Sequence, residues 1–268
     1  MIRFHKRAVI GITALGALGG VNASDANPIP SLSDNLRYAI TPYLWAPGIS
    51  GNIDYNNGQS AHTHISTDKV LNNLSIGAMG DAEVHYGRWG LLGNAIYAKL
   101  SNHGSKTSNL QEGITATVDS TTDAWLGVYT VAGTYTAYVS QSLYVDTLVG
   151  ARFLNFNSKI QLDASLSIPG YTADKTFYSS VRATDAIGGF KGRVRLGESS
   201  WFVPFYLDAG GGSSTAKFTS QQALGIGYAY KHIDLALYYN NLYYSLSNSK
   251  ISSYINMTGP PLAVTFKF

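Results

Sequence analysis

The chain has 268 residues, of which 45% are hydrophobic and only 13% are charged, and it contains 28 glycines, 19 tyrosines and no cysteine. This composition excludes an intrinsically disordered protein, because there is ample apolar surface to bury on folding. The missing cysteines exclude a disulfide scaffold and any site built on thiolate ligands or thiol redox chemistry. The formal net charge of +3 would favour an acidic partner such as nucleic acid only if the positive charge lay in the folded part of the chain.

Residues 1–23 predict a secretory signal peptide instead. Arg3, Lys6 and Arg7 precede an apolar run of 14 residues, Ala8 to Val21, and small residues follow at the spacing that signal peptidase requires. A membrane-spanning helix needs about 20 apolar residues, so we expect cleavage after Ala23. The leader holds three of the 19 basic residues and none of the 16 acidic ones, so the exported chain is formally neutral. We therefore expect no nucleic-acid partner.

From residue 37 onward the dominant sequence period is two, which is typical of β-strands. In residues 75–86, for example, Asp81 and Glu83 alternate with Ala82 and Val84. Each such segment has one face without charge, which suits contact with lipid. Ten segments show the pattern, at residues 37–46, 75–86, 89–101, 114–138, 142–163, 176–196, 200–210, 215–230, 232–246 and 251–268.

The connections between these segments alternate in length. Tight turns are expected at 87–88, 139–141, 197–198 and 231, whereas 47–74, 102–113 and 164–175 are expected to be long polar loops, with a short amphipathic helical turn at 68–74. This layout predicts a closed antiparallel transmembrane β-barrel of ten strands at residues 37–268, preceded by a periplasmic segment at 24–36. Eight or twelve strands remain open, because 114–138 and 142–163 are long for single strands.

Aromatic residues near the predicted strand ends are consistent with the girdles of a membrane barrel, although tyrosine and tryptophan are common in any strand. These residues are Tyr43, Trp45, Tyr86, Trp89, Tyr135, Tyr138, Tyr228, Tyr230, Tyr243 and Tyr244. The last predicted strand, LAVTFKF, has alternate apolar residues and an aromatic last residue. Outer-membrane barrels typically end in this way, so we interpret this strand as an insertion signal carried by Leu262, Val264, Phe266 and Phe268.

The chain also resembles a widespread family of uncharacterised Gram-negative outer-membrane β-barrel proteins. The matching segments are TPYLWAPGISG (41–51), YGRWGLLGNAIYAKLS (86–101), LYVDTLVGARF (143–153), DAIGGFKGRVRLG (185–197), YLDAGG (206–211), ALGIGYAY (223–230) and MTGPPLAVTFKF (257–268). They occur in the family's order over most of residues 37–268. The sequence departs from the family at Lys191, where Arg is common, and at residues 238–241, where a GYRY-like segment is usual. The resemblance implies a fold and an outer-membrane location, and it implies no substrate.

The alternation of residues along each predicted strand places a group of charged residues on the face opposite the lipid-facing one. These candidate lumen residues are Asp81, Glu83, Asp146, Arg152, Asp185, Lys191, Arg193 and Asp208. Buried charges persist only when they are paired or hydrated. We therefore expect either a structural barrel tied by internal ion pairs, such as Asp146 with Arg152 or Asp185 with Arg193, or a narrow porin-like channel of unknown solute.

Three other functions remain open at this point. An outer-membrane enzyme would need a rim site, for which His62, His64, Asp68 and His103 are candidates, but no recognised catalytic or metal-binding motif surrounds them. A surface receptor or adhesin would use the long loops, since binding function concentrates there. A secreted β-sandwich would also show alternation, but it does not explain the terminal Phe268 pattern.

The sequence indicates no cofactor and no metal site, and we do not expect an enzyme. The expected partners are the lipid and lipopolysaccharide of the outer membrane and the barrel-assembly machinery.

Overall fold

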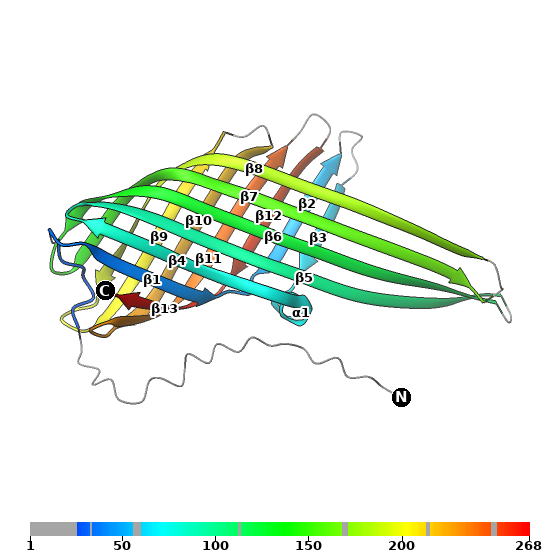
Figure 1. Ribbon diagram of the computed structural model, residues 1–268, viewed down its shortest axis with the longest axis horizontal. Helices are drawn as coiled ribbons and strands as arrows, with labels where there is room; N and C mark the ends of the chain where they lie inside the picture. Colours follow the sequence, from blue (N-terminus) through cyan, green and yellow to red (C-terminus); the bar gives the residue numbers. More distant parts are fainter. Residues whose placement is uncertain are drawn as a thin grey trace.

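The computed structural model describes residues 26–32, 34–55, 60–111, 114–167, 171–212, 215–247 and 251–268, so the predicted signal peptide lies outside the described residues. The described part of the chain consists almost entirely of antiparallel strands (Figure 1). Its elements are β1 (Arg37–Leu44), β2 (Gly48–Tyr55), β3 (Ser60–Ile65), α1 (Thr67–Asn73), β4 (Leu74–Tyr86), β5 (Trp89–Gln111), β6 (Ile114–Val139), β7 (Leu143–Leu166), β8 (Thr172–Arg195), β9 (Trp201–Gly211), β10 (Ala216–Ala229), β11 (Ile233–Ser247), β12 (Ile251–Gly259) and β13 (Leu262–Lys267).

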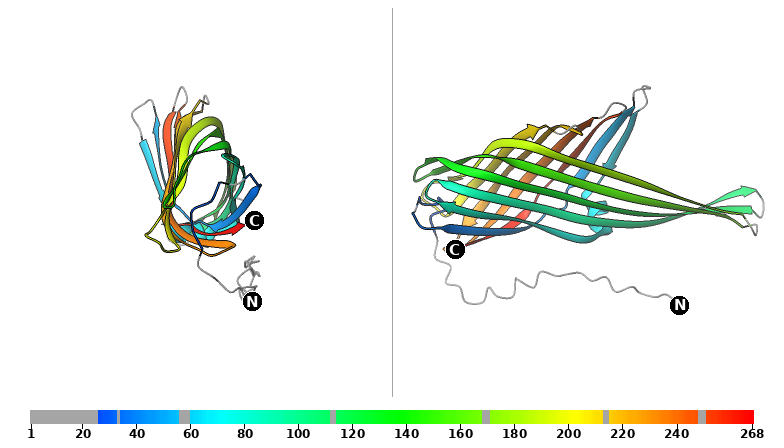
Figure 2. Two further views of the ribbon diagram at one scale, coloured as in Figure 1. Left: turned by 90° about the vertical axis from the view of Figure 1, so that its left-hand side faces the viewer. Right: turned by 45° about the horizontal axis from the view of Figure 1, so that its top comes forward.

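Ten of these strands form a closed ring, which confirms the predicted ten-stranded antiparallel barrel. The order around the ring is β1, β4, β5, β6, β7, β8, β9, β10, β11, β13 and back to β1. The ring closes where Ala39 pairs with Lys267 and Ile40 pairs with Phe266. Figure 2 shows this ring end-on in its left view. Closure leaves no unpaired sheet edge at this level, and this is the condition for a β-sheet to sit in lipid.

The tight turns gather at one end of the barrel, which we call the turn end; the opposite end is the loop end. Gly87 and Gly197 occupy turns there with φ of +56° and +61°, which glycine adopts without strain. The backbones of Tyr38 and Phe268 also exchange hydrogen bonds at the turn end, of 3.2 and 3.0 Å. The start of β1 and the C-terminus therefore lie side by side (Figure 1).

The predicted loop at 47–74 was wrong, because most of it forms β2, β3 and α1. Strand β2 continues the direction of β1 beyond a break at residues 45–47, and β12 likewise precedes β13 across Pro260 and Pro261. Proline lacks the N–H that a ladder needs, so both strands are interrupted at this level. Strands β2 and β12 pair with each other, and the indole N–H of Trp45 donates to the Gly259 carbonyl at 3.1 Å across the two breaks. The predicted helical turn is present as α1.

The predicted loops at 102–113 and 164–175 were also wrong in the main, because β5–β8 continue far past the ring. Pairing of β4 with β5 ends at Leu100, and pairing of β8 with β9 ends at Ala186. Beyond these points β5, β6, β7 and β8 pair only with one another. The result is a four-stranded sheet that projects from the loop end (Figure 1). We call this part, the described residues of 101–124 and 158–181, the blade.

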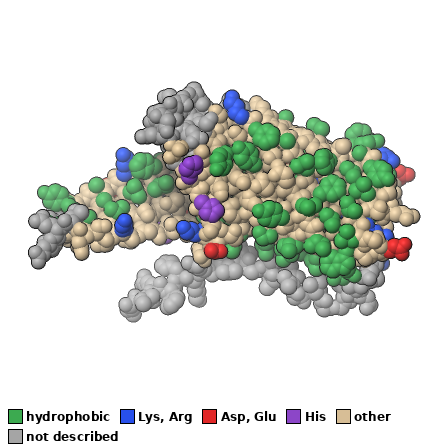
Figure 3. Space-filling view, turned by 180° about the vertical axis from the view of Figure 1, so that it is seen from behind, with side chains coloured by type: hydrophobic (Ala, Val, Ile, Leu, Met, Phe, Trp, Pro, Cys, Tyr) green, Lys and Arg blue, Asp and Glu red, His purple; other side chains and the backbone are tan. Residues whose placement is uncertain are grey.

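The outer face of the barrel is apolar, as lipid contact requires. Figure 3 shows hydrophobic side chains spread over the barrel body, with charged side chains at the turn end. Two outward aromatic pairs mark the turn end: Trp89 lies 4.9 Å from Tyr135, and Trp201 lies 5.0 Å from Tyr228, between ring centroids. Not every predicted girdle residue faces outward. Tyr43, Trp45 and Tyr244 point into the barrel, where Trp45 and Tyr244 are buried.

No helix among the described residues has the length and apolar character needed to span a bilayer.

Candidate functional site

The barrel interior collects charged side chains, and it is the candidate site that the sequence indicated. Alternate residues of each strand point into the barrel, and the strand registers place the inward side chains of adjacent strands at similar heights along the barrel axis. Asp146, Arg152, Asp185 and Asp208 are buried, with exposures of 0–1%. Such burial requires that their charges find partners inside the barrel.

Arg152 and Asp208 form the most deeply buried ion pair. The guanidinium of Arg152 on β7 contacts both carboxylate oxygens of Asp208 on β9, one at 2.9 Å, in the bidentate geometry that favours Arg over Lys. The same guanidinium donates to Gln221 on β10 at 2.9 Å and to the hydroxyls of Thr130 and Thr219 at 3.3 Å. Arg152 therefore ties together strands that are three positions apart in the ring.

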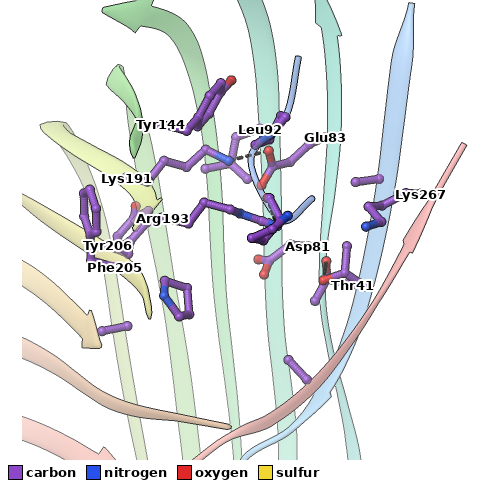
Figure 4. Close-up of a pocket in the computed structure, with 18 of the residues that line it drawn as sticks. Thr41, Asp81, Glu83, Leu92, Tyr144, Lys191, Arg193, Phe205, Tyr206 and Lys267 are labelled. Atoms are coloured by element: carbon purple, nitrogen blue, oxygen red, sulfur yellow. Dashed lines mark hydrogen bonds and ion pairs between the residues drawn. The ribbon is translucent and has the colours of Figure 1, made fainter. Parts of the chain in front are cut away.

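A second cluster lies around Glu83 of β4. Its carboxylate pairs with the ammonium of Lys191 on β8 and lies 3.3 Å from Nε2 of His85. Nε2 of His85 is also 4.0 Å from the carboxylate of Asp146, which accepts a 2.8 Å hydrogen bond from Thr136. Strands β4 and β8 are four positions apart in the ring of ten, so the pair of Lys191 and Glu83 spans the interior (Figure 4).

A third cluster lies at the turn end and contains residues that we did not select from the sequence. Asp234 of β11, with 2% of its side chain exposed, accepts from Arg193 of β8 at 2.8 Å and from Lys267 of β13 at 2.6 Å. The guanidinium of Arg193 also stacks over Phe202, 4.6 Å from the ring centroid. The alternation in residues 233–243 already put Asp234 on the charged face, so the signal was present in the sequence.

The two ion pairs expected from parity were wrong. Arg152 pairs with Asp208 rather than Asp146, and Arg193 pairs with Asp234 rather than Asp185. Parity assigns a residue to the inside of the barrel, but it does not say which strands face one another across a closed ring. Here the partners come from strands two and three positions away, where long side chains reach across the curve of the wall.

A cavity of about 390 Å³ lies in the interior on the turn side of the buried ion pair of Arg152. Its lining mixes apolar side chains with charged and polar ones, among them the Glu83 and Lys191 pair, Arg193, Asp81 and the phenol of Tyr206 (Figure 4). Asp81 accepts a 2.6 Å hydrogen bond from Asn94, which also donates to Tyr43 at 2.8 Å.

The segment before β1 closes the turn end of this cavity. Pro28 and Ile29 are buried, although they precede the barrel in sequence. The carbonyl of Pro28 accepts a 3.1 Å hydrogen bond from Arg193, and residues 27–31 line the cavity. Part of the predicted periplasmic segment, residues 24–36, therefore packs into the mouth of the barrel.

An apolar layer fills the interior toward the loop end. Ile96, Val128, Leu154 and Leu242 point inward from four strands, and each has at most 3% of its surface exposed. The buried cluster also includes Trp45, Ala183, Ala216, Tyr244, Leu246 and Met257. Side chains from opposite walls thus meet on the axis, as they do in the narrowest barrels.

The histidines considered for a rim site lie on strands rather than in a loop. His62 and His64 are exposed on β3, where Nδ1 of His64 lies 3.0 Å from the Ser50 hydroxyl. His103 lies on the blade, 3.0 Å from the Thr121 hydroxyl. In the described ranges, no three His, Cys, Asp or Glu side chains are grouped so that they could hold a metal ion.

No protein-family model and no curated protein matches the chain. Solved structures with similarity include the outer membrane protease OmpT from Escherichia coli, at 9% identity over 91% of this chain and 100% of that chain, with a TM-score of 0.45. The attachment invasion locus protein Ail of Yersinia pestis is 9% identical over 88% and 100% of the two chains, with a TM-score of 0.29. Neisserial surface protein A is 13% identical over 89% and 100%, with a TM-score of 0.28. Similarities this distant assign no activity, substrate or partner to this chain.

Proposed function

We propose that this protein is an integral outer-membrane β-barrel with a closed interior, which anchors the blade at the cell surface. The location is supported by the apolar outer face and by its height. Along β6, the outward residues from Tyr135 to Trp125 span ten residues, or about 25 Å along the membrane normal at the usual strand rise and tilt. This matches the apolar band of roughly 25 Å that such barrels present to lipid.

The filled interior is the observation that carries the proposal. A polar layer centred on Arg152 and Asp208 and an apolar layer centred on Leu242 follow one another along the axis. Pro28 and Ile29 occupy the turn end. A solute would have to displace two packed layers and break a buried ion pair, so the barrel is better suited to anchoring than to diffusion.

Because the interior is filled, we assign the function to the loop end of the barrel. The blade and the shorter extension formed by β2, β3 and β12 rise beyond the ring, where they meet the cell exterior in an outer-membrane protein. A rigid, paired sheet is a better platform for recognition than a flexible loop, because less conformational entropy is lost on binding. We therefore favour a surface-recognition role over a porin-like one, and the proposal contains no catalytic step.

Conductance across planar lipid bilayers tests the closed interior. The purified protein is inserted into planar bilayers, and its folding is verified in parallel by the shift in gel mobility on heating. We expect no steady conductance from the protein, while an open porin inserted under the same conditions conducts. A stable ohmic conductance from the folded protein would overturn the closed barrel and favour the narrow channel.

Cell fractionation tests the location separately. We expect the protein in the outer-membrane fraction with heat-modifiable mobility. Recovery from the soluble periplasm would refute the membrane barrel itself, whatever the bilayer recordings show.

A further inference from the structure

Three cations face outward where the blade leaves the barrel. Lys99 of β5 is the register partner of Trp125 on β6, Lys159 of β7 is the register partner of Asp123 on β6, and Arg182 of β8 is the register partner of Asn155 on β7. All share the parity of the lipid-facing residues lower on the same strands. We call Lys99, Lys159 and Arg182 the basic patch.

The basic patch begins where the apolar band ends. On β5 the outward residues change from Ala95 and Tyr97 to Lys99, and on β7 they change from Phe153 to Asn155 and then Lys159. Trp125 is the outward aromatic residue at the same level on β6. Lysine and arginine at such a boundary keep their stems on apolar surface and extend their charges into the headgroup layer.

The protein itself does not neutralise these charges. Within the described part of the chain, Lys99, Lys159 and Arg182 take part in none of the side-chain hydrogen bonds or ion pairs. Asp123 is the nearest carboxylate in register, and it accepts a 2.6 Å hydrogen bond from Ser101. The patch therefore keeps a net positive charge at the membrane surface.

Carboxylates occupy the same face farther out. Asp119, Asp163 and Asp174 are register partners on β6, β7 and β8, four positions beyond Asp123, Lys159 and Tyr178. Like charges directly opposite one another repel, so this row cannot attract an anion. The outer face of the blade thus carries positive charge next to lipid and negative charge away from it.

From this arrangement we infer that the basic patch binds the phosphorylated headgroup of an outer-leaflet glycolipid of the lipid A class. The inference rests on the outer-membrane location proposed above. Phosphate is the ligand that lysine and arginine recognise best, and a lipid presents it at the height where the apolar band ends. The acyl chains of the same molecule lie against Tyr97, Tyr129 and Phe153, so one ligand satisfies both parts of the surface.

Lipid-dependent stabilisation of the full-length protein in neutral detergent micelles tests the inference. The temperature at which the folded form loses its heat-modifiable gel mobility is measured while diphosphoryl lipid A is added. We expect this temperature to rise with added lipid, and the half-saturating concentration to increase about thirtyfold in the double variant Lys99→Gln/Lys159→Gln. This follows from about fivefold for each charge removed at a membrane surface.

The chain offers a matched control on the other face of the same blade. Lys106→Gln/Lys175→Gln removes the same charge from β5 and β8, but these side chains point to the inner face, where Lys175 lies 5.0 Å from the centroid of the Phe177 ring. We expect this variant to respond to lipid A like the unmodified protein. Equal losses in the two double variants would overturn the inference in favour of a general charge effect.

Two ligand controls distinguish binding of the whole phosphorylated lipid from binding of its acyl chains or its phosphate alone. Dephosphorylated lipid A and inorganic phosphate should each leave the transition temperature unchanged at the concentration where lipid A saturates. A full response to dephosphorylated lipid A, or to phosphate alone, would overturn the inference. Because these measurements use folded protein in detergent, they can fail while cell fractionation still places the protein in the outer membrane.

Discussion

Lys191 of β8 and Glu83 of β4 form an ion pair across the barrel interior, between strands four positions apart in a ring of ten. The side chains remain 15% and 25% exposed, because they line the cavity at the turn end. A pair in this position braces two nearly opposite walls. It therefore adds a side-chain contact across the interior to the backbone pairing that closes the ring.

Loss of one partner of this pair should cost more than loss of both. We expect Glu83→Gln to lower the free energy of unfolding by about 2 kcal/mol, because it leaves the Lys191 ammonium without its carboxylate. Lys191→Met added to Glu83→Gln should recover part of that loss. Urea unfolding of the barrel in lipid vesicles, as a double-mutant cycle, measures the coupling. Strictly additive effects would show that the pair does not act as a unit.

The pair of Arg152 and Asp208 should be the more sensitive of the two. Arg152→Ala leaves Asp208 buried and unpaired, for which we expect a loss of about 3–5 kcal/mol in the same assay. Arg152→Lys keeps the charge but removes the bidentate contact, so its free energy of unfolding should lie between those of the unmodified protein and Arg152→Ala. If Arg152→Lys matches the unmodified protein, charge alone suffices and the guanidinium geometry does not matter.

Arginine on the outer face of β11 should impair insertion in a depth-dependent way. Leu237 lies between Ile226 and Leu262 on the apolar surface, so Leu237→Arg should cost about 2–4 kcal/mol. Leu235→Arg lies beside the girdle residue Tyr228 and should cost less, though still clearly measurable. The fraction of protein with heat-modifiable mobility after refolding into vesicles measures the loss, and we expect it to be lower for Leu237→Arg than for Leu235→Arg.

Ser245→Arg provides the control for this series. It introduces the same residue on the same face of the same strand, but next to Phe218 and Tyr254 near the loop end. We expect a nearly normal folded fraction. A loss at Ser245 equal to that at Leu237 would mean that the apolar band extends higher than the residues on β6 indicate.

The segment that closes the turn end can be probed chemically, because the chain has no cysteine of its own. Ile29→Cys should react slowly with a maleimide in the folded protein, since Ile29 is 7% exposed. Ser31→Cys, two residues away at an exposed position, should react at the rate of a free thiol. Equal rates would show that the mouth of the barrel is open in solution.

The blade should be dispensable for the barrel, because its strands pair only with one another. Replacing residues 101–123 by one tight turn and residues 158–179 by another removes both halves of the blade, and it leaves the pairing of β4 with β5 and of β8 with β9 intact. We expect the truncated protein to retain its heat-modifiable mobility. Failure of this variant to fold would show that the blade is needed during assembly, and a second variant that removes only residues 105–119 would then locate the part required.

The ring could be predicted from the sequence because every strand in contact with lipid must place apolar residues at alternate positions. Segments such as 232–246 alternate so regularly that their inward and outward faces are set by composition alone. The pairing inside the ring could not be predicted in this way. Arg152 had several carboxylates of suitable parity available, and the choice of Asp208 depends on the curvature and stagger of the closed sheet.

The blade escaped prediction for a physical reason as well. Above the apolar band the outer face meets water, so its residues become Ser, Thr, Asn and charged side chains, as in a loop. The inner face keeps an apolar alternation, with Val118, Ile160 and Phe177 exposed on it. In residues 172–181 the apolar residues Ala173, Phe177 and Val181 share the inner face, so this alternation would have extended β8. Residues 102–111 read NHGSKTSNLQ and carry no such alternation, so the sequence held no signal for the outer part of β5.

The blade rises from only four of the ten barrel strands, so the molecule has two different sides when it is viewed along the membrane normal (Figure 1). Its outer face looks away from the barrel axis, over the lipid that borders β5–β8, while its inner face looks back over the mouth. A neighbour diffusing in the leaflet meets a wall on one side of the protein and an open approach on the opposite side. Contacts at the cell surface are therefore directional even though the barrel beneath them is nearly round.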